Sequence, residues 1–174
     1  MISNNYVPEK ISDANIYVSG NKAIGAAASI DLPEINQKTS TLEGMDIAGE
    51  IDSPTIGQFE SMEQAIQFNT LYSSCMDMLS PLKTVELTIR GAQQVYDKNG
   101  GYAHKGVRVV ERGRVKKFKP GKVQKGESME AEVTIELTYL LIEVDGVVLI
   151  EVDKLNSVYI VNGEDMLAGI RELI

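Results

Sequence analysis

The sequence predicts a mainly β domain, and the indication is strongest in residues 126–162. From Ala131 to Leu141 apolar residues alternate with polar ones, a period of two that a helix would scatter around its circumference. Asp145-Gly146 then separates two β-branched runs and supplies the positive φ angles of a two-residue hairpin turn. We therefore expect one long strand that folds back on itself. The expected register pairs Val144 with Val147, Ile142 with Leu149, Leu141 with Ile150 and Tyr139 with Val152.

Near this turn both faces of the expected hairpin are apolar. Leu141 and Ile150 lie on one face. The other face carries Leu140, Ile142, Val144, Val147 and Leu149. One face can fill the core of the subunit, and the other would leave an apolar patch exposed unless something covers it. Either a neighbouring subunit or a helix of the same chain could provide the cover, so the second face is a candidate subunit interface.

Length and composition favour one soluble domain. The 174 residues are enough to bury a core without a metal or a disulfide, and a single cysteine, Cys75, allows no internal disulfide. The first residues lack the basic start and apolar run of a signal peptide, and no apolar stretch reaches the ~20 residues of a membrane helix. We expect a single domain over residues 1–174 that is made in a cytoplasm.

The net charge of −8 conceals a basic strip. Residues 105–125 hold nine of the seventeen basic residues and one acid, Glu111, which leaves a charge of −16 on the remainder. Four of the cations share one face of an expected strand: Arg108, Arg112, Arg114 and Lys116. These side chains could bind phosphate, or they could meet the acidic face of a partner. We favour the second alternative, because the basic excess does not extend over the whole domain.

Turn and loop signals divide the rest of the chain. Residues 1–15 are expected to form a loosely structured arm, and residues 42–57 a long loop, which inside a compact domain is usually functional or disordered. The acids of that loop include Asp46, Glu50 and Asp52. A strand to about Phe68 is followed by a short helix that Pro81 ends. The other expected elements are a hairpin around residues 19–21, strands at 28–41, 85–90, 107–119 and 155–161, a loop at 95–106 and an amphipathic helix capped by Asn162.

The sequence offers little material for catalysis or metal binding. His104 is the only histidine, so no site built on several histidines can form. Cys75 lies in an apolar run, which favours a buried thiol over a nucleophile. Glu130, Glu132 and Glu136 could serve a glycosidase, but a solvated strand face explains them without chemistry. The acids of residues 42–57 do not follow the spacing of a calcium-binding loop, so we assign no catalytic residue, cofactor or metal.

Several short motifs, in order along residues 10–174, resemble those of a known family. They are Arg90-Gly91-Ala92-Gln93, Arg112-Gly113-Arg114-Val115-Lys116, Pro120-Gly121-Lys122, Lys125-Gly126-Glu127, the Asp145-Gly146 turn, Ile150-Glu151-Val152-Asp153-Lys154-Leu155-Asn156 and Val161-Asn162-Gly163-Glu164-Asp165-Met166-Leu167. Each motif is weak alone, and together in this order they are specific. The chain resembles the major tail tube protein of contractile-tailed phages and of phage-tail-like bacteriocins.

The resemblance implies a fold of two packed antiparallel sheets, a β-sandwich or barrel, with one or two short flanking helices. It implies homohexameric rings that stack into a rigid hollow tube inside a contractile sheath, with no catalytic residues and no cofactor. The implied partners are the chain itself, the tail sheath protein, the baseplate and tail terminator proteins, and transient DNA in the channel, without stable nucleic-acid binding. The tube would belong to a virion tail or a phage-tail-like particle that is assembled in the bacterial cytoplasm.

Within that arrangement the candidate residues acquire roles. The apolar hairpin face becomes the subunit interface, and the loop at 42–57 bridges stacked rings. Acids that face the channel would repel DNA and let it slide. The expected channel-facing acids are Glu63, Glu130, Glu132 and Glu136. A type VI secretion tube component is the alternative, and a carbohydrate-processing β-sandwich enzyme is a more distant one. The sequence leaves open whether the tube serves a phage or a headless bacteriocin.

Overall fold

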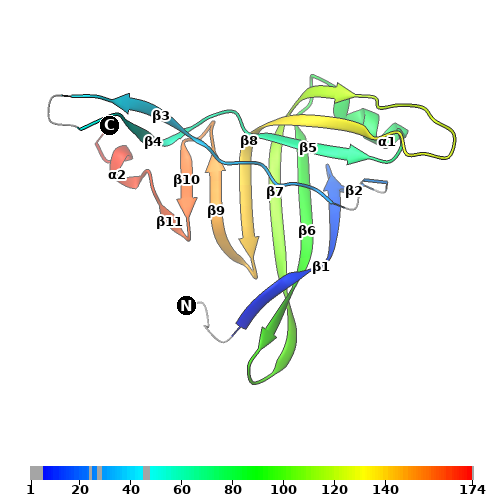
Figure 1. The fold of residues 1–174 in the computed structure, drawn as a ribbon, viewed down its shortest axis with the longest axis horizontal. Coiled ribbons are helices and arrows are strands. Elements are labelled where there is room, and N and C mark those ends of the chain that lie inside the picture. The colour runs from blue at the N-terminus through cyan, green and yellow to red at the C-terminus, as the bar shows by residue number, and fades with distance from the viewer. Residues whose placement is uncertain (1–5, 24, 27–28, 45–47, 174) are drawn as a thin grey trace.

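The computed structural model describes residues 6–23, 25–26, 29–44 and 48–173, apart from the side chains of residues 74 and 75 (Figure 1). The described residues form a nine-stranded sheet and a two-stranded sheet, both antiparallel, with short helices beside them, which confirms the predicted fold class. The strands are β1 (Tyr6–Val18), β2 (Asn21–Lys22), β3 (Gln37–Leu42), β4 (Ile51–Phe59), β5 (Glu63–Phe68), β6 (Val85–Asp97), β7 (Gly101–Lys119), β8 (Ala131–Val144), β9 (Val147–Asp153), β10 (Val158–Val161) and β11 (Glu164–Asp165). The helices are α1 (Ser73–Met76), a 3-10 turn (Asp77–Leu79) and α2 (Ala168–Arg171).

The large sheet folds over on itself to make two layers. Its strand order is β11-β10-β9-β8-β7-β6-β1-β2, and β5 also pairs with β8. One edge of β8 pairs with β7 along almost its whole length, while the other edge pairs first with β5 and then with β9. Figure 1 shows β7 and β8 curving from the vertical strands into an upper layer with β5. The core therefore lies between two layers that share β7 and β8.

Two irregularities mark the place where β7 and β8 bend. The pairing passes from Arg112 opposite Tyr139 to Gly113 opposite Leu137, which leaves Thr138 as an extra residue, and a second shift leaves Lys116 extra. An extra residue in one strand is a β-bulge, which bends the strand and changes the face on which the next side chains lie. Leu137 and Leu140 accordingly both lie in the core, although strict alternation would place them on opposite faces.

The core is built from both layers. Met62, Ile66 and Phe68 come from β5 and the residue before it, and the lower layer supplies Leu87, Val109, Leu140 and Val152. Burying an aliphatic or aromatic side chain of this size contributes roughly 1.5–3 kcal/mol, so the contact between the layers holds the bend closed. The segment from residue 29 to 36 crosses in front of the sheet in Figure 1, and Gln64 fixes it by donating a hydrogen bond to the carbonyl oxygen of Asp31 at 2.9 Å.

The predicted hairpin is confirmed, with a correction to its register. Asp145 and Gly146 form the turn with φ angles of 53° and 78°, and Val144 lies opposite Val147. Leu149 is then an extra residue, so Ile142 lies opposite Ile150 and Leu140 opposite Val152. The expected pairs beyond Val144 are therefore wrong by one residue. The bulge has a physical reason, because it brings Ile150 and Val152 onto the face that packs against the core.

Other predicted elements are confirmed in part. The strand that ends at Phe68 and the short helix before Pro81 are present. The prediction of an irregular arm is wrong from Tyr6 onwards, because β1 pairs with β6 from that residue. Residues 1–5 lie outside the described part of the chain. Backbone hydrogen bonds to β6 hold β1. Such bonds do not require apolar and polar residues to alternate, so the sequence contains no pattern that predicts the strand. The loop expected at 95–106 is likewise strand, because β6 and β7 pair out to Asp97 and Gly101.

Two further segments need correction. The loop predicted at 42–57 begins only after Leu42 and ends before Ile51, where β3 and β4 pair, and the strand predicted at 28–41 is confined to β3. Asn162 does not cap a helix. It forms a hairpin turn with Gly163, with φ angles of 54° and 84°, and a short helix follows only at Ala168–Arg171. Glu164 and Asp165, which follow this turn, form β11 and pair with β10. This pairing takes the place of the first turn of the predicted helix.

We predict that Gly113→Ala destabilises the protein by about 1–3 kcal/mol, because a Cβ atom at Gly113 would collide with the carbonyl oxygen of Glu136 at the bend. Thermal unfolding followed by circular dichroism measures the change. Gly106→Ala is a matched control on the same strand, since a Cβ atom there meets no atom within 4 Å. Equal stability of the two variants would contradict the role assigned to Gly113.

Candidate assembly surfaces

The outer face of the lower layer is charged, and its charges are paired within the chain. Arg108 contacts Glu143 at 2.5 Å, and Arg112 contacts Glu86 at 3.0 Å. The guanidinium group of Arg112 also lies 4.6 Å from the centre of the Tyr139 ring. Arg108 and Arg112 were predicted to face a partner, and both meet acids of their own subunit.

A second charged cluster covers the outer face of the upper layer. The Lys116 ammonium group forms ion pairs with Glu63 and Glu136, and Ser61 donates a hydrogen bond to Glu136 at 2.6 Å. The hydrogen bond with Glu63 is the main cause that raises the pKa of Lys116. Partial burial works against ionisation of Glu136, but hydrogen bonds from Ser61 and Lys116 lower its pKa below the usual value. Lys154 approaches the same carboxylate at 3.9 Å.

The predicted channel-facing acids are divided by this arrangement. Glu63 and Glu136 belong to the cluster around Lys116, Glu132 is half-buried opposite Lys119, and Glu130 lies at the start of β8 with Lys122 at 3.6 Å. Glu63 and Glu136 therefore meet Lys116, a cation of the predicted basic face, while Glu130 meets Lys122, which lies outside that face. Arg114 is exposed on β7, directly opposite Glu136 in the register.

The predicted apolar interface is only partly available to a neighbour. Leu140 is fully buried and Ile142 packs against the core, so these two side chains are covered by their own subunit, contrary to prediction. The bulge at Thr138 is the cause, because it turns the even-numbered residues that follow it in β8 toward the core. Val144 and Leu149 are half-buried, and Val147 is 51% exposed at the tip.

The predicted inter-ring loop is the tip of a hairpin. Glu50 and Asp52 are exposed there, and Thr41 donates a hydrogen bond to Asp52 at 3.0 Å. Asp46 lies outside the described residues. Leu42 and Ile51 lie opposite one another at this tip and are 47% and 51% exposed. The tip thus combines acids with an exposed apolar pair.

Glu111 is a notable residue that sequence reasoning did not single out as a site. Its side chain is fully buried on the inner face of β7, between Leu87 and Leu140 in the register, and neither carboxyl oxygen has a hydrogen-bond partner among the described residues. Burial raises the pKa of this carboxyl group to about 8. Its position as the one acid within the basic strip was the only signal, and that signal says nothing of burial.

The remaining candidates carry little chemistry. Among the described residues no group of three or more histidine, cysteine, aspartate or glutamate side chains could hold a metal ion. Within the same part of the chain, no helix combines the length and apolar character needed to span a membrane. His104 is exposed on β7, and the side chain of Cys75 lies outside the described residues.

The fold and these surfaces define a mainly β protein whose large sheet ends in open strand edges at β1 and β11 and whose outer faces carry ion pairs within the chain. The model of the family described as phage tail tube protein FII matches residues 8–174, and the chain belongs to that family. The tail tube protein of Escherichia phage P2 is 28% identical over 164 residues, covering 92% of this chain and 94% of the relative. The major tail tube protein of Serratia phage KSP20 is 25% identical over 160 residues, covering 92% of this chain and 91% of the relative.

We predict that Glu111 makes stability fall as pH rises. The unfolded chain loses this proton near pH 4.5, whereas the folded protein keeps it to about pH 8. Between these values the unfolded state binds fewer protons, so the free energy of unfolding falls by about 1.4 kcal/mol per pH unit through this group alone. Below that window the group costs nothing by this route, and above it the cost is constant.

Glu111→Gln removes this titration. The difference in the free energy of unfolding between Glu111→Gln and the parent protein should therefore grow steadily between about pH 5 and pH 8, as measured by urea unfolding at equal protein concentration. Glu127→Gln, at an exposed loop position, controls for the loss of one carboxyl group. A difference that does not change with pH would refute the assignment.

Proposed function

We propose that this protein is the structural subunit of a phage tail tube. The observation that carries the proposal is the match of the tail tube family over residues 8–174, with two relatives that each cover 92% of the chain. The subunit would act mechanically, as part of the wall of a rigid conduit, with no catalytic step.

We further infer that copies of the chain form hexameric rings that stack into a hollow tube within a contractile sheath. The open edges of the large sheet support this inference. β2 pairs only with Tyr17 and Val18, so the outer edge of β1 from Tyr6 to Asn15 has no strand partner among the described residues. β11 is the outermost strand at the other end and has two residues. Pairing such edges between copies satisfies backbone groups that would otherwise promote aggregation.

The wall of the channel remains a proposal at the level of residues. Glu63, Glu130, Glu132 and Glu136 are the acids assigned to it. Among the described residues these four acids outnumber the cations that pair with them, which are Lys116, Lys122 and Lys154. Such a wall would therefore hold DNA less strongly than a basic one and would let it slide. The sheath, baseplate and tail terminator proteins are the proposed partners, and assembly would take place in the bacterial cytoplasm. Whether the particle is a phage or a headless bacteriocin follows from the neighbouring genes, which in a phage include capsid and terminase genes.

Electron microscopy of the purified protein in negative stain tests the proposed function. We expect rings or tubes of constant diameter, because a tube subunit carries its assembly contacts on its own surface. A protein that stays monomeric at high concentration over a range of salt concentrations would overturn the proposal.

The hairpin tip at Val147 gives a more local prediction. Val147→Glu should block assembly while the far-UV circular dichroism spectrum stays unchanged, because a buried charge without a partner is strongly unfavourable at an interface and this side chain is 51% exposed in the subunit. Val147→Thr, which keeps the branched shape without a charge, is the control and should assemble. Normal tubes from Val147→Glu would remove this tip from the interface.

A further inference from the structure

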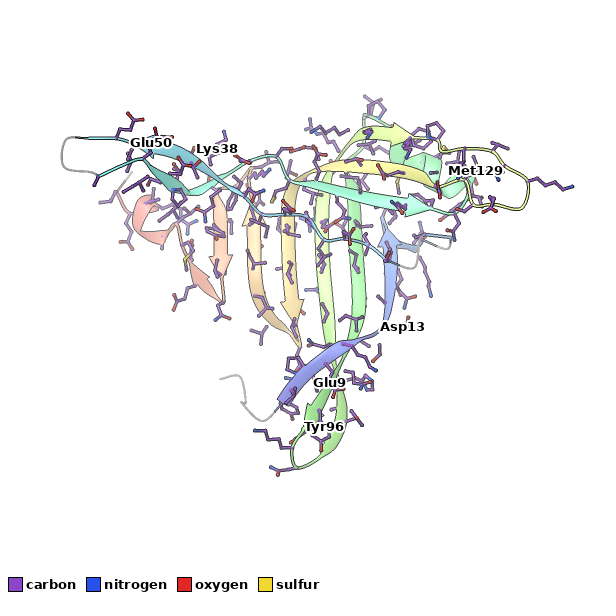
Figure 2. The ribbon with its side chains drawn as sticks, viewed as in Figure 1. Glu9, Asp13, Lys38, Glu50, Tyr96 and Met129 are labelled. Carbon is purple, nitrogen blue, oxygen red and sulfur yellow. The ribbon has the colours of Figure 1, made fainter. Side chains whose placement is uncertain are left out.

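The two ends of the upper part of the molecule carry opposite charges. Figure 2 shows Glu50 and Met129 at opposite ends of the longest axis of the molecule. The hairpin of β3 and β4 lies at one end, and the segment that joins β7 to β8 lies at the other. We call the first the acidic tip (Glu43, Glu50 and Asp52) and the second the basic end (residues 114–125).

The basic end has more cations than the chain itself neutralises. Residues 114–125 contain no acid, and their cations are Arg114, Lys116, Lys117, Lys119, Lys122 and Lys125. The rest of the segment up to β8 adds Glu127 and Glu130, so residues 114–130 carry a net charge of +4. Lys116 pairs with Glu63 and Glu136, and Lys122 pairs with Glu130. The other four side chains are exposed, and no ion pair joins them to an acid in the described part of the chain.

The loop of the basic end is held in place by its own backbone. Gly121 has a φ angle of 83°, and a side chain there would collide with the carbonyl oxygen of Met129. That same oxygen accepts a hydrogen bond from the Lys122 amide at 2.8 Å, and the Met129 amide donates to the carbonyl oxygen of Asn69 at 2.8 Å. The loop is thus closed at its base and tied to the residue after β5. It presents its cations at a fixed place.

The acidic tip is the complementary surface. Glu43, Glu50 and Asp52 are exposed there, and Lys38 is the only basic residue between residues 37 and 59. The exposed apolar pair of Leu42 and Ile51 lies among these acids. The basic end also carries an exposed apolar side chain, Val123, at 91%. Each end therefore combines charge with apolar surface that a partner could cover.

We propose that the acidic tip of one copy docks on the basic end of a second copy of this chain. Because the two surfaces differ and lie at opposite ends, each copy both offers and receives the contact, which is a head-to-tail association that can close into a ring or extend as a filament. Charge complementarity guides the encounter and sets its register, and salt weakens it because charges are screened beyond about 10 Å at 0.1 M salt. The inference deepens the proposed function, and its place in a tube rests on that function.

A second copy fits the basic end better than nucleic acid does. The chain as a whole has a net charge of −8, which opposes binding to a phosphate backbone. The matching acids are present on the same chain, so no other component is needed. Binding of DNA at the basic end is treated as an outcome of the test.

Two charge-reversal variants and their mixture test the proposal. The tip reversal is Glu43→Lys with Glu50→Lys, and the end reversal changes the four cations without an ion pair among the described residues to glutamate: Arg114, Lys117, Lys119 and Lys125. In either variant the two surfaces have the same sign, so the concentration needed for assembly should rise at least about tenfold. In an equimolar mixture every contact between unlike copies is again matched. The mixture should therefore assemble near the parent concentration, as alternating copies.

Sedimentation velocity and electron microscopy measure the assembly, and circular dichroism checks that each variant is folded. Lys98→Glu is the control for reversing one exposed lysine away from the basic end. Lys98 lies on the turn between β6 and β7, so this variant should assemble like the parent protein. If both reversals assemble like a tube-forming parent, the docking inference is overturned and the proposed function stands.

The remaining outcomes separate the two proposals. If the parent forms no tubes but the two reversals associate with one another in sedimentation and neither associates with itself, the proposed function fails and the docking inference holds. If the reversals lose assembly and their mixture does not regain it, the inference is overturned. Loss of duplex DNA binding in the end reversal alone would then assign the basic end to nucleic acid.

Discussion

The structure depends on a competition for one edge of β8. That edge pairs with β5 over its first half and with β9 over its second half, while β7 occupies the opposite edge. Two partners can share an edge only if the strand bends between them, so that each continues into a different layer. The extra residue at Thr138 and the absence of a side chain at Gly113 allow this bend. The core between the layers follows from this bend.

The charges of the chain serve two different purposes. Arg108 and Arg112 pair with acids on the strands beside β7, and Lys116 pairs with Glu136 on β8 and with Glu63 on β5. These pairs are exposed and screened by water, so they contribute little to the stability of the fold. Glu111 acts in the opposite direction, since its buried carboxyl group costs stability whenever the unfolded chain is ionised. Four exposed cations without an ion pair in the described part of the chain lie at one end of the molecule: Arg114, Lys117, Lys119 and Lys125.

Much of the fold could be predicted from the sequence, because it rests on local patterns. The alternation before Asp145-Gly146, the turn itself and the short helix before Pro81 are all confirmed. The bulges at Thr138 and Leu149 could not be predicted, because a single extra residue leaves no mark in composition. The same bulges decided the candidate site. They turned Leu140 and Ile142 into the core and set which acids lie beside Lys116, a pairing that spans the sequence from Glu63 to Glu136.

A tube built from one kind of subunit needs at least two different contacts for each copy, because one head-to-tail contact repeats in only one direction, as a closed ring or a filament. This chain offers two contacts of different physical character. The open edges of β1 and β11 can join by short-range backbone hydrogen bonds, which require close alignment. The acidic tip and the basic end attract over a longer range and tolerate less exact placement. On the proposed arrangement the charged ends bring copies together and orient them, and the strand edges then lock the alignment.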